Sequence, residues 1–505
     1  MAEPNIVYNQ TDLRDALTAV NNNKEGEIIL GSNIALDTPW VTIEKLEGTE
    51  SNDIIINGNG YQIGDAEHPL TSALIGEGLH VTVNNVKIYC VREEIVESAN
   101  EVLVGSFFNR VQFAELEGCV ASGLITITIN NPASYGGFFG GLIGLARQGN
   151  DAKAGTISLS NCINNIDIVV YKDENGSSNG SIGGIIGYAA GEKVTITDCY
   201  NHGKIEANLR CIGGIIGKSV GQTTIINECV NCAEIKAETE KYEMFVGGIL
   251  GYINGNGYTS QPLVEHCDNK GDILVKGIKK QFVGGIAGEG VRITITECSS
   301  SVGVTILATS YSGSVTADEW FVGGIVGRVW TYVSSKVNKC TNYSNVISTE
   351  HGYVAGIAGY VYNYSASSVE DVYELSNYGD IEGTFYAAGI CGRSDASIIN
   401  SNNYGNIISD NGAAAGITCE ISADRKIGSC DNYGKVRGFS FASGIVREGH
   451  VIESCVNRGE INANGAGGLA AGIACVLTIA SNPPGTMTNC HNKGDIISLN
   501  IASGI

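Results

Sequence analysis

One short phrase, close to Val-Gly-Gly-Ile-x-Gly, recurs twelve times through the last three-quarters of the chain and limits its fold more than any other feature. Successive copies lie 27 to 43 residues apart. A period of this size is typical of solenoids, in which each unit buries its apolar face only against its neighbours. The apolar residue at the centre of the phrase falls at Leu142, Ile185, Ile215, Ile249, Ile286, Ile325, Ile357, Ile390, Ile417, Ile445, Ile473 and Ile505.

Each unit carries a second phrase, Cys-x-Asn-x-Gly-x-Ile, of which Cys199–Ile205 is one example. A short alternating run of β-branched residues comes just before it, as in Val194–Thr197, and such alternation is a strand signal. A unit therefore reads as a strand, an Asn-x-Gly turn, a short strand, a Gly-Gly corner and a third segment, with no helix between them. This order predicts an all-β fold, a right-handed single-stranded parallel β-helix.

Stacking the units in register would place equal positions about 4.8 Å apart. We expect the recurring isoleucine to form a buried ladder. The glycine before it is present in all twelve copies, and it would supply positive φ or room for close backbone packing at the corner. The turn asparagine is expected to adopt the left-handed conformation and to bond to its equivalent one turn away.

A helix is expected before the array. Thr11–Asn21 has an amphipathic pattern with Thr11 as N-cap, and this helix would cover the open N-terminal edge of the solenoid. The predicted organisation is therefore a helical cap with irregular first turns over residues 1–130, followed by a repeat β-helix of about twelve units over 131–505. Because the last copy stops at Ile505, we expect the chain to continue in a longer protein or to be capped by another molecule.

The net charge of −22 over 505 residues argues against a nucleic-acid partner, because phosphate binding needs clustered Lys and Arg. The most apolar stretch, Gly465–Ala480, is short, contains glycines and carries one of the repeats. We therefore expect no membrane insertion in this segment.

The paired phrases Asp198–Gly203 and Ile182–Tyr188 closely resemble the GLUG repeat of large bacterial surface proteins, which include adhesins and some IgA-protease-like proteins. The resemblance covers about residues 135–505, and Thr11–Ile63 resembles the onset of a pectin-lyase-like β-helix. It implies a secreted or cell-surface bacterial protein and supplies no active site. Three late copies depart from the motif, with Cys419, Arg447 and Cys475 in place of the last glycine.

Sixteen cysteines are the most prominent chemical feature, and nine of them share one repeat position. Leu375 and Ser401 fill the same position in two units, and exchange with leucine indicates a small, buried, apolar site. We expect a ladder of free thiols, because parallel stacking is poor geometry for disulfides. The nine positions are Cys162, Cys199, Cys229, Cys267, Cys298, Cys340, Cys430, Cys455 and Cys490.

Other motifs predict no metal site, no cofactor and no catalytic residue. Cys229 and Cys232 form the only CxxC, and a zinc site would need two more ligands. Gly213–Ser219 imitates a phosphate-binding loop but has Ile212 where the first glycine belongs. The seven histidines are scattered and no HExxH is present, so the sequence does not encode that type of metallopeptidase site.

A polysaccharide lyase or hydrolase on a β-helix would need clustered carboxylates and a basic residue near the sugar. The nearest candidates are Arg437, Arg447 and Arg458, which we expect to face Glu448 and Glu453 from successive late units. We interpret this group as a solvated surface.

Four tyrosines share the position directly after the turn asparagine: Tyr343, Tyr378, Tyr404 and Tyr433. Stacked units would place them in an exposed aromatic ladder. Aromatic faces beside Asn and Asp groups bind sugar rings or peptides, so these four residues are the predicted ligand-binding site. The alternative is that stacking across turns only stabilises the solenoid.

Three hypotheses for function follow. The leading one is a non-catalytic adhesin or stalk, extracellular or on the bacterial cell surface, that binds host or microbial glycans or surface proteins along an acidic face. The second is a polysaccharide lyase or hydrolase, or a phage tail-spike depolymerase. The third is a fibre segment that associates end to end through its C-terminal turn.

Overall fold

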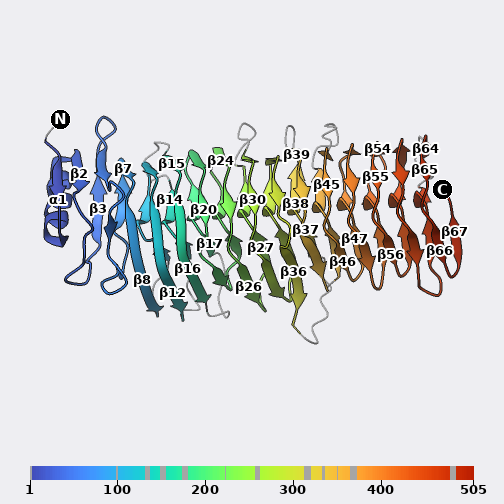
Figure 1. Ribbon diagram of the computed structural model, residues 1–505, viewed down its shortest axis with the longest axis horizontal. Coiled ribbons are helices and arrows are strands. Elements are labelled where there is room, and N and C mark those ends of the chain that lie inside the picture. The colour runs from blue at the N-terminus through green and yellow to red at the C-terminus, as the bar shows by residue number, and fades with distance from the viewer. Residues whose placement is uncertain are drawn as a thin grey trace. The chain divides into compact units, whose positions relative to one another are not determined.

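The computed structural model describes residues 3–97, 101–130, 137–147, 155–172, 180–221, 223–255, 262–311, 320–331, 336–349, 351–363, 372–477 and 485–505. These residues form short strands and one helix (Figure 1). The chain divides into two compact units. The first unit comprises Met1–Ala237 and Ile249–Pro262, and the second comprises Glu238–Gly248 and Leu263–Ile505.

The helix α1 (Gln10–Asn23) lies against β2 (Gly26–Leu30) and β3 (Ile43–Glu47) in the first unit (Figure 1). The predicted helix is confirmed, but Thr11 is not its N-cap. The cap is Asn9, whose side-chain oxygen accepts a hydrogen bond from the Asp12 backbone N–H at 3.0 Å. The Asp12 carboxylate in turn accepts a hydrogen bond from the backbone N–H of Tyr8 at 3.3 Å. Local side-chain to backbone bonding of this kind fixes where a helix begins.

The remaining chain of the first unit winds through four parallel sheets, which we number in the order that one turn visits them. A representative turn passes from sheet 1 through two strands of sheet 2 to sheets 3 and 4. Its strands are β19 (Lys193–Thr197), β20 (Tyr200–Asn201), β21 (Ile205–Ala207), β22 (Cys211–Gly213) and β23 (Ile216–Ser219).

Every sheet of the first unit is parallel and pairs each strand with its equivalent one turn later. In this unit, sheet 1 begins with β1 (Asn5–Val7) and ends with β24 (Thr223–Asn227), and sheet 2 includes the strands from β5 (Gln62–Ile63) to β25 (Val230–Asn231). Sheet 3 extends from β9 (Val102–Val104) to β22, and sheet 4 extends from β3 to β28 (Leu250–Asn254).

The second unit repeats the same arrangement with shorter turns. One turn consists of β49 (Ile398–Ile399), β50 (Asn402–Asn403), β51 (Ile407–Ser409), β52 (Ala413–Ala415) and β53 (Thr418–Ile421). In this unit, sheet 1 extends from β29 (Leu263–Glu265) to β64 (Thr486–Thr488), and sheet 2 from β30 (Asp268–Asn269) to β66 (Ile496–Ser498). Sheet 3 extends from β27 (Met244–Gly247) to β67 (Ile501–Ser503), and sheet 4 from β33 (Ala287–Val291) to β63 (Ala474–Leu477). The predicted fold class, a right-handed parallel β-helix with an N-terminal helix, is confirmed.

The core consists of ladders of equal residues. Of the twelve apolar positions in the glycine phrase, those from Leu142 to Ile473 are fully buried, and only Ile505 is exposed. The buried isoleucine ladder is therefore confirmed within each unit. Because each ladder is buried by the turns next to it, the repeat supplies its own core.

Asparagines form a second buried ladder in sheet 2. The Asn377 amide nitrogen donates to Asn403 Oδ1 at 2.8 Å, and Asn403 donates to Asn432 Oδ1 at 2.7 Å. The amide of Asn377 also donates to the carbonyl of Gly379 at 2.8 Å. The predicted bonding between equivalent asparagines is confirmed, and it satisfies polar groups that burial would otherwise leave unpaired.

The left-handed residue of each turn is not the asparagine. It lies three residues earlier, for example Glu374 (φ 57°) before Asn377 and Asn400 (φ 49°) before Asn403. The asparagine itself belongs to an extended strand, because its side chain must point inward to reach the next turn. Our prediction of a left-handed asparagine was therefore wrong.

The described residues contain no helix with the length and hydropathy needed to cross a membrane. Within the apolar stretch 465–480, Leu469–Ala471 forms β62 and Ala474–Leu477 forms β63. Residues 478–480 lie outside the described residues.

Candidate functional site

The four predicted tyrosines form one row on the outer surface of sheet 2 in the second unit. Successive residues of a strand point to opposite faces, so each ladder asparagine points inward and the tyrosine after it points outward. Tyr343, Tyr378, Tyr404 and Tyr433 are 41%, 46%, 38% and 41% exposed. We call this row the tyrosine ladder.

The rings of the tyrosine ladder are stacked on one another. Their centroids are 5.0 Å apart between Tyr343 and Tyr378, 4.5 Å between Tyr378 and Tyr404, and 4.7 Å between Tyr404 and Tyr433. The interplanar angles are only 13°, 6° and 13°. Because the rings cover each other's faces, the ladder presents ring edges and hydroxyl groups to solvent. The predicted binding site required open aromatic faces, which this stacking does not provide.

Charged and polar groups border the ladder. At its C-terminal end, the Arg458 guanidinium lies 5.3 Å from the Tyr433 ring centroid and pairs with Asp431 at 3.2 Å. The Tyr433 hydroxyl also donates to Asp431, at 3.2 Å. Desolvation by burial, together with the neighbouring phenols and Asp431, raises the pKa of Tyr404. The Tyr404 hydroxyl therefore stays protonated at physiological pH.

A second aromatic row lies on sheet 3 of the second unit, on residues that point away from the inner ladders. Phe245, Phe282, Phe321 and Tyr353 are only 1% to 6% exposed. Their rings stack at 5.0, 5.7 and 6.0 Å, and Tyr386 continues the row 4.7 Å beyond Tyr353. Outward residues this deeply buried must be covered by another part of the unit.

The cover comes from the outward residues of sheet 4. The Arg328 guanidinium lies 4.1 Å from the Phe282 ring centroid, and the Tyr360 ring lies 5.4 Å from that of Phe321. The outer rows of sheets 3 and 4 therefore meet across the Gly-Gly corner, and we call this contact the corner seam. Its residues stand four before and three after the ladder isoleucine, as Phe321 and Arg328 do around Ile325. That fixed spacing is a signal that our sequence reasoning missed.

Ion pairs and hydrogen bonds occupy the charged groups of the corner seam. Glu289, only 4% exposed, pairs with Arg328 at 2.7 Å. Farther along, the Tyr353 hydroxyl donates to Glu420 at 3.0 Å, and Arg447 contacts Glu420 at 2.5 Å and Glu448 at 3.0 Å. Burial is the largest single effect and disfavours the charged form of Arg447, but the carboxylates of Glu420 and Glu448, with Cys419 and Tyr386, together outweigh it and raise the pKa of Arg447.

Glu420 and Glu448 are register partners in sheet 4, so two carboxylates do lie side by side. General acid-base chemistry on a sugar needs two carboxyl groups in distinct environments, one protonated and one ionised. Here one guanidinium, that of Arg447, contacts both carboxylates. The arrangement is therefore that of an ion-pair network at a packed corner.

The arginine group expected from the sequence is not one site. Arg447 lies on sheet 4, whereas Arg437 lies on sheet 2 and pairs with Asp410 at 3.4 Å. Arg458, next to sheet 2, pairs with Asp431, and Glu453 pairs with Lys426 at 3.7 Å. Arginines close in sequence separate here because one turn distributes them over different sheets.

All sixteen cysteines are free, and eight of the nine ladder cysteines are buried, the exception being the half-buried Cys490. Burial raises the pKa of the Cys391 and Cys419 thiols to about 12. In the CxxC pair, Cys229 is buried while Cys232 is half-exposed. Among the described residues, no three His, Cys, Asp or Glu side chains are grouped in a way that could hold a metal ion.

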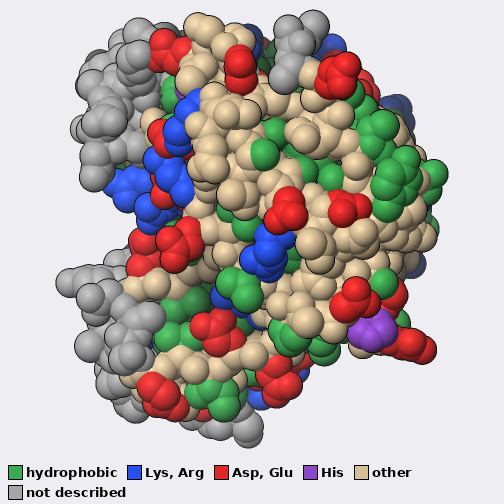
Figure 2. All heavy atoms as spheres, turned by 90° about the vertical axis from the view of Figure 1, so that its left-hand side faces the viewer, with side chains coloured by type: hydrophobic (Ala, Val, Ile, Leu, Met, Phe, Trp, Pro, Cys, Tyr) green, Lys and Arg blue, Asp and Glu red, His purple; other side chains and the backbone are tan. Residues whose placement is uncertain are grey.

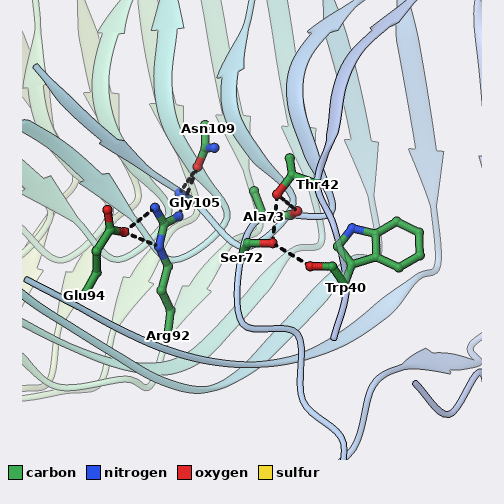
Figure 3. Close-up of polar contacts among 8 residues, drawn as sticks. All are labelled: Trp40, Thr42, Ser72, Ala73, Arg92, Glu94, Gly105 and Asn109. Atoms are coloured by element: carbon green, nitrogen blue, oxygen red, sulfur yellow. Dashed lines mark hydrogen bonds and ion pairs between the residues drawn. The ribbon is translucent and has the colours of Figure 1, made fainter. Parts of the chain in front are cut away.

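The first unit contains two further polar features. In one, Arg92 contacts Glu94 at 2.8 Å and Asn109 at 3.3 Å, while Thr42, Ser72 and Trp40 exchange hydrogen bonds (Figure 3). Arg92, Glu94 and Asn109 belong to one turn, whereas Thr42 and Trp40 bond to Ser72 on the next turn. The other is a hollow of about 260 Å³, and its lining residues are Glu25, Gly26, Glu27, Ser51, Asn52, Asp53 and Ile55.

The comparisons with known proteins show no family. No family model matches the chain, and no curated protein matches it. The GLUG assignment therefore stays a resemblance. Among solved structures, the chain is similar to a "putative immunoglobulin A1 protease" from Bacteroides ovatus, with 18% identity and a TM-score of 0.37. The match covers 63% of this chain and 80% of that one.

Proposed function

We propose that this chain is a non-catalytic binding protein, secreted or displayed on a bacterial cell surface, that recognises glycan chains through the tyrosine ladder. The observation that carries this proposal is the row of four stacked, exposed phenols at Tyr343, Tyr378, Tyr404 and Tyr433.

The geometry favours an extended, hydroxyl-rich ligand. Centroid spacings of 4.5 to 5.0 Å place phenol groups at regular intervals along one sheet. Each phenol hydroxyl is both a donor and an acceptor, and the exposed ring edges offer apolar contact beside it. A polysaccharide lying along the ladder would meet the same pair of groups at every turn, so that weak contacts add along the chain.

Charge favours a neutral glycan over a polyanion. The chain has a net charge of −22, and Asp380 and Asp431 stand beside the ladder. Figure 2 shows the left-hand side of Figure 1, where α1 lies; there, too, Asp and Glu side chains are spread over the surface, and several Lys and Arg side chains are grouped at one edge. A field of this sign repels polyanions.

A depolymerising enzyme is the second candidate, because Tyr353, Glu420, Arg447 and Glu448 bring acidic, basic and phenolic groups together in the corner seam. We rank it second because those groups are bonded to one another. A protein ligand is the remaining alternative for the ladder.

The test is affinity electrophoresis of the full chain through gels that contain neutral or acidic polysaccharides. We compare the native chain with the double variant Tyr378→Phe/Tyr404→Phe, which keeps the stacked rings and removes two hydroxyl groups. A matched control is Tyr61→Phe, at a tyrosine that is 38% exposed and lies outside the ladder.

We expect a neutral polysaccharide to retard the native chain and the control, and to retard the double variant less. Equal retardation of all three would exclude the tyrosine ladder as the site. Retardation by acidic polymers alone would contradict the neutral-glycan proposal, and absence of retardation in every gel would leave a protein as the ligand to be sought.

A further inference from the structure

A guanidinium on sheet 4 of the second unit has surroundings unlike those of the other seam arginines. Arg393 belongs to β48 (Cys391–Ser394), is half-buried, and is the register partner of Tyr360 on one side and Glu420 on the other. Its guanidinium carbon lies 5.1 Å from the Tyr360 ring centroid. This cation-π contact holds the planar head in place but occupies none of its hydrogen-bond donors.

Both nearby carboxylates have other partners. Glu420 accepts from the Tyr353 hydroxyl and pairs with Arg447. Asp395 accepts from the Tyr360 hydroxyl at 2.9 Å and from Ser422 at 2.6 Å. Within the ranges that the structure describes, the guanidinium of Arg393 takes part in no ion pair or hydrogen bond.

Two arginines of the same seam show the contrast. Arg328 stands two turns earlier in the same row and is paired with Glu289 at 2.7 Å. Arg447, on a neighbouring strand position, contacts two carboxylates. A half-buried guanidinium has five N–H donors that water reaches only in part. A guanidinium that has no hydrogen-bond partner in the protein is therefore a strong site for a planar, bidentate acceptor.

We propose that Arg393 binds a single carboxylate group of a ligand, as on an acidic sugar within an otherwise neutral glycan. Glu420 and Asp395 lie close by, so a doubly charged phosphate or a polyanion would be repelled more than a singly charged carboxylate. The site lies on sheet 4, whereas the tyrosine ladder lies on sheet 2. The proposal for Arg393 can therefore be tested independently of the proposal for the tyrosine ladder.

The experiment is a ligand-observed NMR titration of the full chain with sodium glucuronate, glucose and sodium phosphate as separate probes. We expect saturable binding of glucuronate, with glucose and phosphate weaker. In Arg393→Gln the affinity for glucuronate should fall at least about tenfold, which corresponds to about 1.4 kcal/mol. Arg393→Lys keeps the charge but loses the planar fork, so it should restore only part of the affinity.

Arg437→Gln is the control, because this arginine is exposed, lies on sheet 2 and pairs with Asp410. It should bind glucuronate as the native chain does. The proposal is overturned if Arg393→Gln keeps the native affinity, if glucose or phosphate binds as tightly as glucuronate, or if the native chain shows no saturable binding. Circular dichroism of each variant distinguishes loss of the site from loss of the fold.

Discussion

The side-chain amide of Asn377 fills the space in which a side chain on Gly356 would have to lie. A Cβ atom on Gly356 would be 2.3 Å from Asn377 Cγ and 2.2 Å from the carbonyl oxygen of Gly389. The same encounter recurs along the chain, for example between Gly324 and Asn342 and between Gly416 and Asn432. The glycine of one repeated sequence motif and the asparagine of the other therefore contact each other across the core.

This contact predicts that Gly356→Ala destabilises the second unit. The added methyl group has no room beside Asn377 and the Gly389 backbone, and overpacking of this kind costs about 1–3 kcal/mol. The midpoint of urea unfolding, followed by circular dichroism, should fall accordingly. The control is Gly467→Ala, where a Cβ atom would meet nothing within 4 Å. Equal midpoints for the two variants would contradict the argument.

The seam ion pair predicts different costs for two arginines. Arg447→Ala leaves Glu420 and Glu448 without their shared cation in a site where the Arg447 side chain is only 14% exposed, so we expect a loss of about 1–3 kcal/mol. Arg437→Ala removes a pair whose side chains are 50% and 71% exposed, and such pairs contribute about 0–1 kcal/mol. Thermal unfolding of both variants checks the difference, and a larger loss for Arg437→Ala would refute it.

Burial predicts that most thiols are inert in the folded chain. With the pKa of Cys391 and Cys419 raised to about 12, only about one thiol in 10⁴ is ionised at pH 8, and the thiolate is the reactive form. Iodoacetamide should label the half-exposed Cys232 before the buried Cys391, and should label Cys391 only after urea is added. Peptide mass spectrometry measures the order in which the thiols are labelled. Labelling of Cys391 before urea is added would contradict this prediction.

The carboxylate of Glu206 predicts one component of acid sensitivity. A hydrogen bond from Lys236 and another from Tyr171 lower its pKa below the usual value of 4.5. A carboxyl group whose pKa is lower in the folded state stabilises the fold above its unfolded pKa, and this contribution is lost as the pH falls through the folded pKa. The stability difference between the native chain and Glu206→Gln should therefore be full at pH 6 and shrink below about pH 4.5.

Urea titrations at pH 6 and at successively lower pH values measure this difference. The control is Glu115→Gln, at an exposed carboxylate of β11 (Ala114–Glu117). A stability difference for Glu206→Gln that stays constant down to pH 3 would contradict the assignment.

Recurrence made much of the fold predictable. The isoleucine ladder and the buried cysteines followed from their periodic spacing, because equal positions in a solenoid share one environment. The left-handed residue and the helix cap did not follow, since spacing alone does not show which residue of a turn adopts positive φ, here Glu374, or which polar side chain caps the helix, here Asn9. The corner seam also escaped sequence reasoning, because Tyr353 and Glu420 meet only through the angle between two sheets.

The tyrosine ladder was half predictable. The shared position after the asparagine predicted that Tyr378 and Tyr404 would stack, and their rings do so at 4.5 Å. Position alone could not show that the rings would cover each other's faces. The ladder therefore offers a ligand a row of hydroxyl groups, whereas the sequence had predicted aromatic faces on which sugar rings could stack.

The most direct test of the account measures binding and cleavage in the same sample. The full chain is incubated with a neutral polysaccharide that retards it in a gel, and the polymer is then sized by light scattering after chromatography. We predict that the polymer is bound and keeps its full length, and that Tyr378→Phe/Tyr404→Phe binds it more weakly. Shortened polymer would contradict the non-catalytic account and direct attention to Glu420 and Arg447 in the corner seam.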